Sequence, residues 1–347
     1  MRWIAALALC ITLAVPARAM EFIAPQVPEQ ADAYMPADTG SFADRILELV
    51  NKALRMLNPE LKEASRVGIA LTAAALMVSV AQTVSSAGKT SVHLAGIAAV
   101  AAILLNTTGS MIHLGADTVA SISDYSRLLL PVMASALAAQ GGITSAPALY
   151  AGTALFNSLL ITIMEQMVLP GIWLYLALSI ASLATGEDLL KKLADLVKGL
   201  ITWGLKILMM VFTTYLGITG VISGTADVAA LKATRVTMSS FVPVVGGVLS
   251  DASEAILVSA GLMKNAAGIY GILAVLAVFL HPFLRISVHY LILRLTGAVC
   301  AMFGGKASSS DMMERFGSAM ALMLAVTASG CVMTLISTIC FMKGVSG

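Results

Sequence analysis

The sequence predicts an all-α polytopic membrane protein, and three properties support that prediction. Of its 347 residues, 59% are hydrophobic and only 12% are charged, whereas a soluble domain carries about 25% charged residues. Apolar stretches recur along most of the chain, at lengths near the roughly 20 residues that a helix needs to cross a bilayer. The formal net charge of +2 excludes a strongly basic nucleic-acid binder.

Residues 1–19 have the pattern of a cleaved signal peptide. Arg2 precedes the apolar run from Trp3 to Val15, and Ala17-Arg18-Ala19 is a small-x-small cleavage site. An uncleaved first span is the alternative, although the run is shorter than the ~17 residues that a span needs. The next segment, residues 20–65, is acidic and interrupted by prolines, so we expect it to be extracytoplasmic.

This segment contains a predicted amphipathic helix. Ser41 is a suitable N-cap, and Asp44 three residues later completes a capping box. One apolar stripe follows and ends at Asn58-Pro59; it consists of Ile46, Leu49, Val50, Ala53 and Leu57. Two placements stay open: the helix lies on the membrane surface, or it docks onto a partner outside the membrane.

Residues 66–347 predict a transmembrane domain of about 7–9 membrane-embedded helices, some of them short or re-entrant. The apolar runs are Val67 to Val84, Val92 to Leu114, Leu128 to Ala139, Ala146 to Ile163, Ile172 to Thr185, Leu200 to Ile222, Ala266 to Leu284, Ile286 to Phe303 and Phe316 to Met342. Two of them, Leu128 to Ala139 and Ile172 to Thr185, are too short to cross a core of ~30 Å unaided. We expect these to be half-helices or re-entrant hairpins, with breaks at Gly141-Gly142 and Pro170-Gly171, or parts of kinked helices.

The positive charges predict the orientation. An outside N-terminus puts the loop with Lys89 in the cytoplasm, and nine crossings would place Glu187 to Lys198 and the terminal Lys343 there as well. The segment from Glu187 to Lys198 is predicted to be an interfacial helix. The stretch from Gly115 to Arg127 is predicted to be a loop on the opposite side.

Small residues within the spans allow close helix packing, for example at Gly68 and Gly96. Packing within the chain and subunit contacts in a homo-oligomer are both open.

No catalytic, cofactor or metal site is predicted. Ala87-Gly88-Lys89-Thr90 resembles the end of a phosphate-binding loop, but Thr83 stands where its first glycine belongs. The four histidines lack metal-ligand spacing. Three cysteines remain after the leader, without C-x-x-C spacing, and are expected to be packing residues.

A few polar residues within the spans are candidate site residues. His281, Arg285 and His289 recur every four residues and therefore share one helix face, which would line water or a pore. The alternative is that Pro282 ends the helix and leaves Arg285 at the interface. Glu165, five residues before Pro170, is either interfacial or a proton carrier.

The stretch from Gly217 to Glu254 is the most distinctive part of the chain. Its centre combines Pro243 with Gly246 and Gly247, which favour irregular backbone, and Asp251 follows. Irregular backbone at membrane depth must line a cavity or be buried in protein. We expect a re-entrant or interfacial hairpin at 241–251, with a plain extracytoplasmic turn as the alternative.

These residues resemble the stage III sporulation protein AE family of endospore-forming bacteria. The resemblance rests on Gly217-Ile218-Thr219-Gly220, on Asp227 to Arg235 and above all on Phe241 to Gly247 with Leu249-Ser250-Asp251. It implies a membrane component of the channel-like, secretion-like complex between mother cell and engulfed forespore, located in the mother-cell membrane that surrounds the forespore. The implied partners are other stage III sporulation membrane proteins, a separate cytoplasmic ATPase, a ring of extracellular subunits and a forespore-membrane protein.

The first hypothesis is therefore a non-enzymatic subunit of a translocation complex that forms part of its conduit. The second is an ion-coupled secondary transporter that uses Glu165 or the Arg285 face. The third is a structural platform that only assembles partners.

Overall fold

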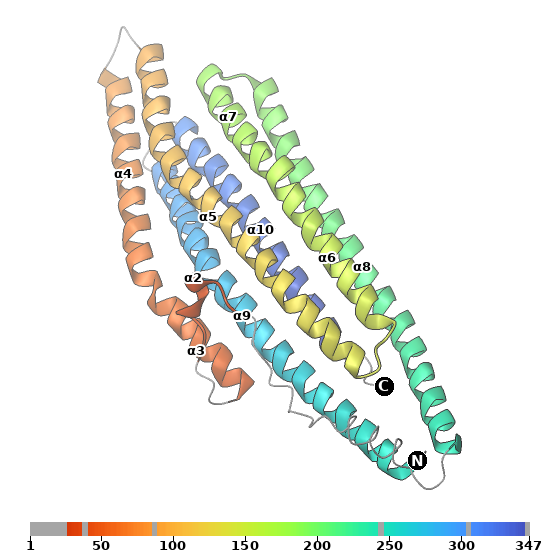
Figure 1. The fold of residues 1–347 in the computed structure, drawn as a ribbon. Helices are drawn as coiled ribbons and strands as arrows, with labels where there is room; N and C mark the ends of the chain where they lie inside the picture. The colour runs from red at the N-terminus through yellow and green to blue at the C-terminus, as the bar shows by residue number, and fades with distance from the viewer. Residues whose placement is uncertain (1–25, 37–40, 85–88, 242–245, 303–306, 344–347) are drawn as a thin grey trace.

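The structure is a computed structural model that describes residues 26–36, 41–84, 89–241, 246–302 and 307–343. Within these ranges, the side chains of 29–30, 83–84, 89, 220–241, 246–264 and 307–308 are not described. The predicted signal peptide lies outside the described residues. Every regular element in the described ranges is a helix (Figure 1), so the all-α prediction is confirmed.

Short helices precede a set of very long ones. In chain order the elements are α2 (Glu29–Asp32), α3 (Phe42–Arg55), α4 (Leu57–Val84), α5 (Lys89–Ala139), α6 (Ser145–Ile163), the π-helix η1 (Met164–Val168), α7 (Leu169–Thr185), α8 (Asp188–Phe241), α9 (Gly246–Met302) and α10 (Ala307–Lys343).

Six helical stretches of the described residues are long and apolar enough to cross a membrane, which is fewer than the seven to nine expected. The difference arises because three pairs of neighbouring apolar runs are each continuous. Val92 to Leu114 and Leu128 to Ala139 are both parts of α5, and the two runs around Pro282 are both parts of α9. The two runs around Pro170 form α6, η1 and α7 without a reversal of the chain.

The residues from Gly115 to Arg127, expected to form a loop, are instead the middle of α5. Their charged residues Asp117, Asp124 and Arg127 are exposed, while Val119, Ile122 and Tyr125 are buried in the core. That buried face stabilises helix across a stretch whose overall polarity favoured a loop.

Prolines inside the long helices do not end them. Pro131 lies within α5 and Pro282 within α9, and Pro170 occupies the first turn of α7 directly after the π-helix. Packed membrane helices tolerate proline where neighbouring groups satisfy the freed carbonyl. The predicted break at Gly141-Gly142 does occur, between α5 and α6, and Gly141 has a φ of 94°, which favours glycine.

The long helices run antiparallel, side by side along one axis (Figure 1). The end of α4, the start of α5 and the α7–α8 connection lie at one end, and the α5–α6 connection and the end of α10 lie at the other. Lys89 and the lysines of Glu187 to Lys198 therefore share an end, whereas Lys343 lies at the opposite one. This differs from the nine-crossing topology, in which all three were on one side.

The segment Glu187 to Lys198 was predicted to be an interfacial helix. From Asp188 onward it is the start of α8 and continues into the span.

Helix α10 is the central element and contacts α5, α6, α7, α8 and α9. Buried hydrogen bonds fix the relative heights of these helices: Asn157 Nδ2 on α6 donates to Ser126 Oγ on α5 at 2.7 Å, and Thr153 Oγ1 donates to Ser337 Oγ on α10 at 3.1 Å.

The predicted capping box of the amphipathic helix is confirmed. The Asp44 backbone N–H donates to Ser41 Oγ at 3.3 Å, and the Ser41 backbone N–H donates to the Asp44 carboxylate at 3.1 Å. Helix α3 ends at Arg55, but Pro59 does not terminate the helical path, because α4 begins at Leu57.

Part of the apolar stripe of α3 packs on this chain itself. Leu49 and Ala53 are buried, and α3 contacts α9. The helix still exposes Leu47 at 60% and Leu54 at 48%, so the membrane surface and an external partner both stay predictions for its other side.

Candidate functional site

The candidate site is a cluster of charged side chains around Arg285 on α9. Its Nε lies 2.7 Å from Oε2 of Glu60, and its Nη2 lies 3.5 Å from Oε2 of Glu63. Both carboxylates come from the start of α4, where they are also favourably placed near the helix N-terminus. One cation thus faces two anions at the point where α4 meets α9.

The two ion pairs differ in burial. The Glu60 side chain is 13% exposed and that of Arg285 is 28% exposed, whereas Glu63 is 59% exposed. An ion pair shielded from water is screened less than an exposed one. Glu60 is therefore the principal partner of Arg285.

The N-terminal segment covers this pair from the side. The ring of Tyr34, which follows α2, stacks on the ring of His281 with 5.2 Å between the centroids. Lys52 of α3 donates from Nζ to the carbonyl oxygen of Met35 at 2.8 Å. Burial raises the pKa of the Tyr34 phenol, and the nearby Glu60 carboxylate raises it further. Tyr34, α3 and the start of α4 therefore cover the face of α9 that carries His281 and Arg285.

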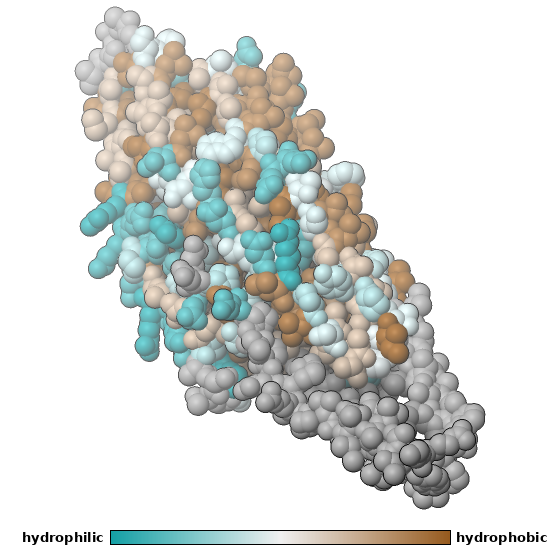
Figure 2. All heavy atoms as spheres, in the orientation of Figure 1, coloured by the Kyte–Doolittle hydropathy of each residue, from teal (hydrophilic) through white to brown (hydrophobic). Residues whose placement is uncertain are grey.

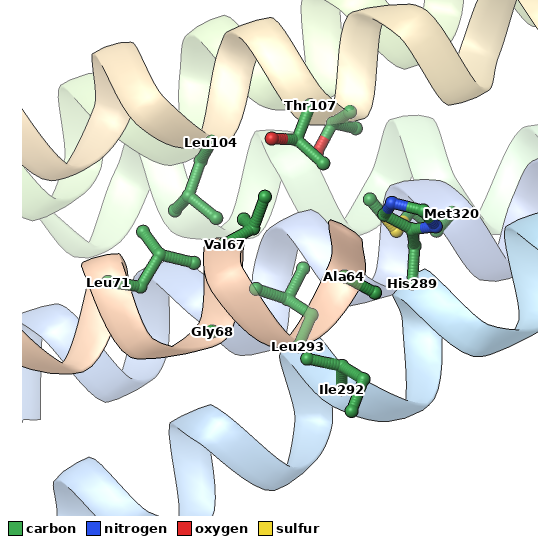
Figure 3. A pocket seen from close by; sticks show the side chains of 11 residues that line it. Ala64, Val67, Gly68, Leu71, Leu104, Thr107, His289, Ile292, Leu293 and Met320 are labelled. Atoms are coloured by element: carbon green, nitrogen blue, oxygen red, sulfur yellow. The ribbon is translucent and has the colours of Figure 1, made fainter. Parts of the chain in front are cut away.

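His289 lies one turn beyond Arg285 and points into the core. It is only 3% exposed, and its Nδ1 lies 3.0 Å from the carbonyl oxygen of Arg285. The ring borders a small enclosed space of about 10 Å³, which is room for about one water molecule. Figure 3 shows His289, Thr107 and Met320 around it, with apolar side chains from α4 and α9. A space of this size is not a conduit.

The predicted stripe of His281, Arg285 and His289 does lie on one continuous helix, because Pro282 does not end α9. Among the described residues of the single chain, this stripe borders no open pore. His281 and Arg285 are covered by the N-terminal segment, and His289 is buried.

Glu165 lies elsewhere, on the π-helix between α6 and α7. Its side chain is exposed, and no ion pair links it to Arg285 among the described residues. π-helices are rare and occur often at functional sites, so Glu165 stays a candidate.

The central motif lies mostly outside the described residues. Pro243 is not described, and for Gly246, Gly247 and Asp251 only the backbone is described, as the start of α9. The motif and the Arg285 site are separate, because the 34 residues from Asp251 to Arg285 span about 50 Å at 1.5 Å per residue of helix.

Sequence reasoning missed the partners of Arg285. Glu60 and Glu63 were assigned to the polar outside segment, although a buried arginine needs a carboxylate partner. The useful signal was their spacing of three residues, which places both on one side of a helix. No group of three potential metal ligands occurs among the described residues.

Comparisons with known proteins agree on one family. The family model described as stage III sporulation protein AE matches residues 31–344. Among curated proteins, the chain is similar to the stage III sporulation protein AE of Bacillus subtilis (strain 168), with 23% identity over 210 residues that cover 58% of this chain and 51% of that protein. The chain thus spans about half the length of the curated relative it matches. No solved structure matches.

Proposed function

Because this chain belongs to the stage III sporulation protein AE family, we propose that it is a non-enzymatic membrane subunit of the channel complex between mother cell and forespore, and that its helices form part of the conduit. The observation that carries this role is the family match over residues 31–344. The six apolar helices support a multi-pass location in a membrane, for which we propose the mother-cell membrane around the forespore.

The proposed partners follow from the same role. They are other stage III sporulation membrane proteins, extracellular ring-forming subunits, further copies of this chain and a separate cytoplasmic ATPase. A separate source of energy is supported by the incomplete phosphate loop, since Thr83 replaces its first glycine and Lys89 begins a transmembrane helix.

An ion-coupled transporter that uses the Arg285 face has less support, because that arginine is already neutralised by Glu60 at 2.7 Å. Glu165 on the π-helix stays a candidate proton carrier for such a transporter.

The decisive experiment deletes the coding sequence in the source organism and complements it with the full chain carrying an affinity tag. We expect loss of heat-resistant spores and of late forespore gene expression in the deletion, and rescue by the wild-type chain. The tagged chain is then purified from sporulating cells and the assembly is imaged. Helices of this chain around an opening are expected; a peripheral position would favour the platform, and normal sporulation of the deletion strain would refute the role.

Substitution of Lys89 tests whether this chain itself hydrolyses ATP. Lys89→Ala is expected to leave spore yield unchanged, and the purified chain is expected to hydrolyse no ATP. Hydrolysis that this substitution abolishes would contradict a separate ATPase.

A further inference from the structure

Helix α5 exposes a polar stripe along its middle. The members are Asn106, Ser110, His113, Asp117, Asp124 and Arg127, and all six are exposed in the single chain. At 100° per residue they fall within a sector of about 100° on the helix. Between Ala95 and Arg127, all of whose side chains are described, no large apolar side chain is exposed. The stripe is therefore a face of α5 and not a set of scattered polar residues.

The length of this α5 stripe matches a bilayer. From Asn106 to Arg127 the helix rises about 32 Å at 1.5 Å per residue, close to the ~30 Å hydrocarbon core of a membrane. Figure 2 shows teal and white spheres over the middle of the face that α5 crosses in Figure 1.

Neighbouring helices expose large apolar side chains at the same heights. Near the Ser126 end, Asn157 hydrogen-bonds to Ser126 at 2.7 Å, and α6 exposes Leu155 at 57% and Leu159 at 40%. Side chains such as these are suited to lipid.

The same contrast holds at the other end of the stripe. A Cβ placed on Gly109 would lie 3.3 Å from the Trp173 ring, which sets these residues at one height. At this height α7 exposes Leu174 at 51%, whereas α5 exposes Ser110 and His113, which lie within about one helical turn of Gly109.

Two faces of one bundle thus differ in polarity at equal depth. Leu155 and Leu174 fit hydrocarbon, but Asp117 and Asp124 do not, because a charged side chain at membrane depth must face water or protein. Arg127 pairs with Asp124 at 3.3 Å, and both remain more than 60% exposed, so this pair does not bury the charge.

We propose that the α5 stripe lines a water-filled passage whose opposite wall is formed by further copies of this chain, which deepens the conduit role proposed above and rests on it. Identical copies arranged around a symmetry axis would bring the same face of α5 to the axis from each subunit. Beyond Asn106 the same face continues as Ala102, Ala99 and Ala95, all exposed, and small residues let helices of adjacent copies approach closely in lipid. Water and small hydrophilic solutes are the class of material that this lining admits.

Thiol reactivity tests the water-filled face. The four native cysteines are replaced, and single cysteines are introduced in the full chain as height-matched pairs: Ser110→Cys with Leu174→Cys, and Asp124→Cys with Leu155→Cys. Membranes from sporulating cells are then treated with a charged thiosulfonate. Because the thiolate is the reactive form and apolar surroundings suppress it, we expect the stripe positions to react at least about tenfold faster than their partners.

Two outcomes would overturn the water-filled face. Fast reaction of both members of each pair would place this height outside the bilayer. Slow reaction of both members would mean that protein seals the stripe.

Cross-linking tests the opposite wall. Ala102→Cys is expected to form disulfide-linked dimers of this chain under mild oxidation, while Met77→Cys on the exposed face of α4 is not. Failure of Ala102→Cys to cross-link would overturn the assignment of that wall to a second copy.

Spore yield is scored separately for every variant, so that failure of the proposed α5 lining can be distinguished from failure of the proposed function. Slow stripe reactivity in a strain that sporulates normally contradicts the lining alone. A deletion strain that sporulates normally contradicts the proposed function, whatever the reactivity.

Discussion

The guanidinium Nε of Arg285 lies 2.7 Å from Oε2 of Glu60, so one ion pair ties the middle of α9 to the first turn of α4. Both side chains are mostly buried. The other carboxylate close to Arg285 is that of Glu63, at 3.5 Å from Nη2. Loss of either partner leaves a poorly solvated charge.

Glu60→Ala should therefore destabilise the protein. We expect a cost of about 1–3 kcal/mol, less than for a fully buried pair because the arginine keeps some access to water. The measurement is the unfolding midpoint in detergent, together with the amount of protein in the membrane.

Glu63→Ala is the matched control. It removes the more distant and more exposed carboxylate, so a cost below about 1 kcal/mol is expected. The charge swap Glu60→Arg with Arg285→Glu should recover part of the lost stability; equal losses in the swap and in Glu60→Ala would show that the pairing contributes little.

Gly271→Leu should disturb the contact between α9 and α5. A Cβ at this position would lie 2.6 Å from Cδ2 and 3.0 Å from Cδ1 of Leu129, so added bulk forces the helices apart. Overpacking of this kind costs roughly 1–3 kcal/mol. The same substitution at Gly199, where a Cβ meets nothing within 4 Å, should be tolerated, and equal midpoints for the two variants would contradict the packing.

The hydrogen bond from Asn157 to Ser126 should contribute a measurable coupling energy. A double-mutant cycle with alanine at both positions is expected to give about 0.5–1.5 kcal/mol, in the range found for polar pairs between membrane helices. Ser135→Ala replaces Ser126→Ala in a control cycle, because the exposed Ser135 hydroxyl donates to the Val132 carbonyl on its own helix. A coupling near zero would show that each group finds another partner.

The sequence predicted the fold class correctly because composition alone distinguishes a membrane bundle from a soluble domain. It also located the capping box at Ser41 and Asp44, since that pattern is local. The number of membrane-spanning helices was harder to predict. Pro282 and the polar run from Gly115 to Arg127 favour breaks, and only tertiary packing of their apolar faces keeps the helices continuous.

At the candidate site, too, local patterns could be predicted from the sequence and contacts between distant segments could not. The periodicity of His281, Arg285 and His289 correctly put three residues on one helix. It could not reveal that Glu60, more than 200 positions away, pairs with Arg285, because a contact between distant segments has no local signature. The exposed face of α5 was also missed, since a stretch with Asp117 and Asp124 was interpreted as a loop.

Lys192→Cys and Lys343→Cys should be labelled from opposite sides of the membrane. Three of the six spans lie between these positions and alternate in direction, whereas nine crossings would put both in the cytoplasm. An impermeant thiol reagent applied from outside should modify one position and spare the other until the membrane is made permeable. Labelling of both from the same side would restore an odd number of crossings.

Replacement of Gly246 and Gly247 by leucine should leave the protein in the membrane but abolish spore formation. Leucine favours a continuous helix and adds bulk where α9 begins. Spore counts are compared at equal membrane abundance with a double leucine substitution at exposed positions of α10. Normal sporulation of the glycine variant would show that the motif is a tolerant connection.

Helix α9 is much taller than a bilayer is thick. Its 57 residues extend about 85 Å at 1.5 Å per residue, whereas the hydrocarbon core accounts for ~30 Å. If α9 stood upright in a bilayer, more than half of its length would lie beyond the hydrocarbon core. A change in tilt of about 10° moves the far end of a 55 Å projection sideways by about 10 Å. A small reorientation within the membrane thus becomes a large displacement where the helix meets its surroundings.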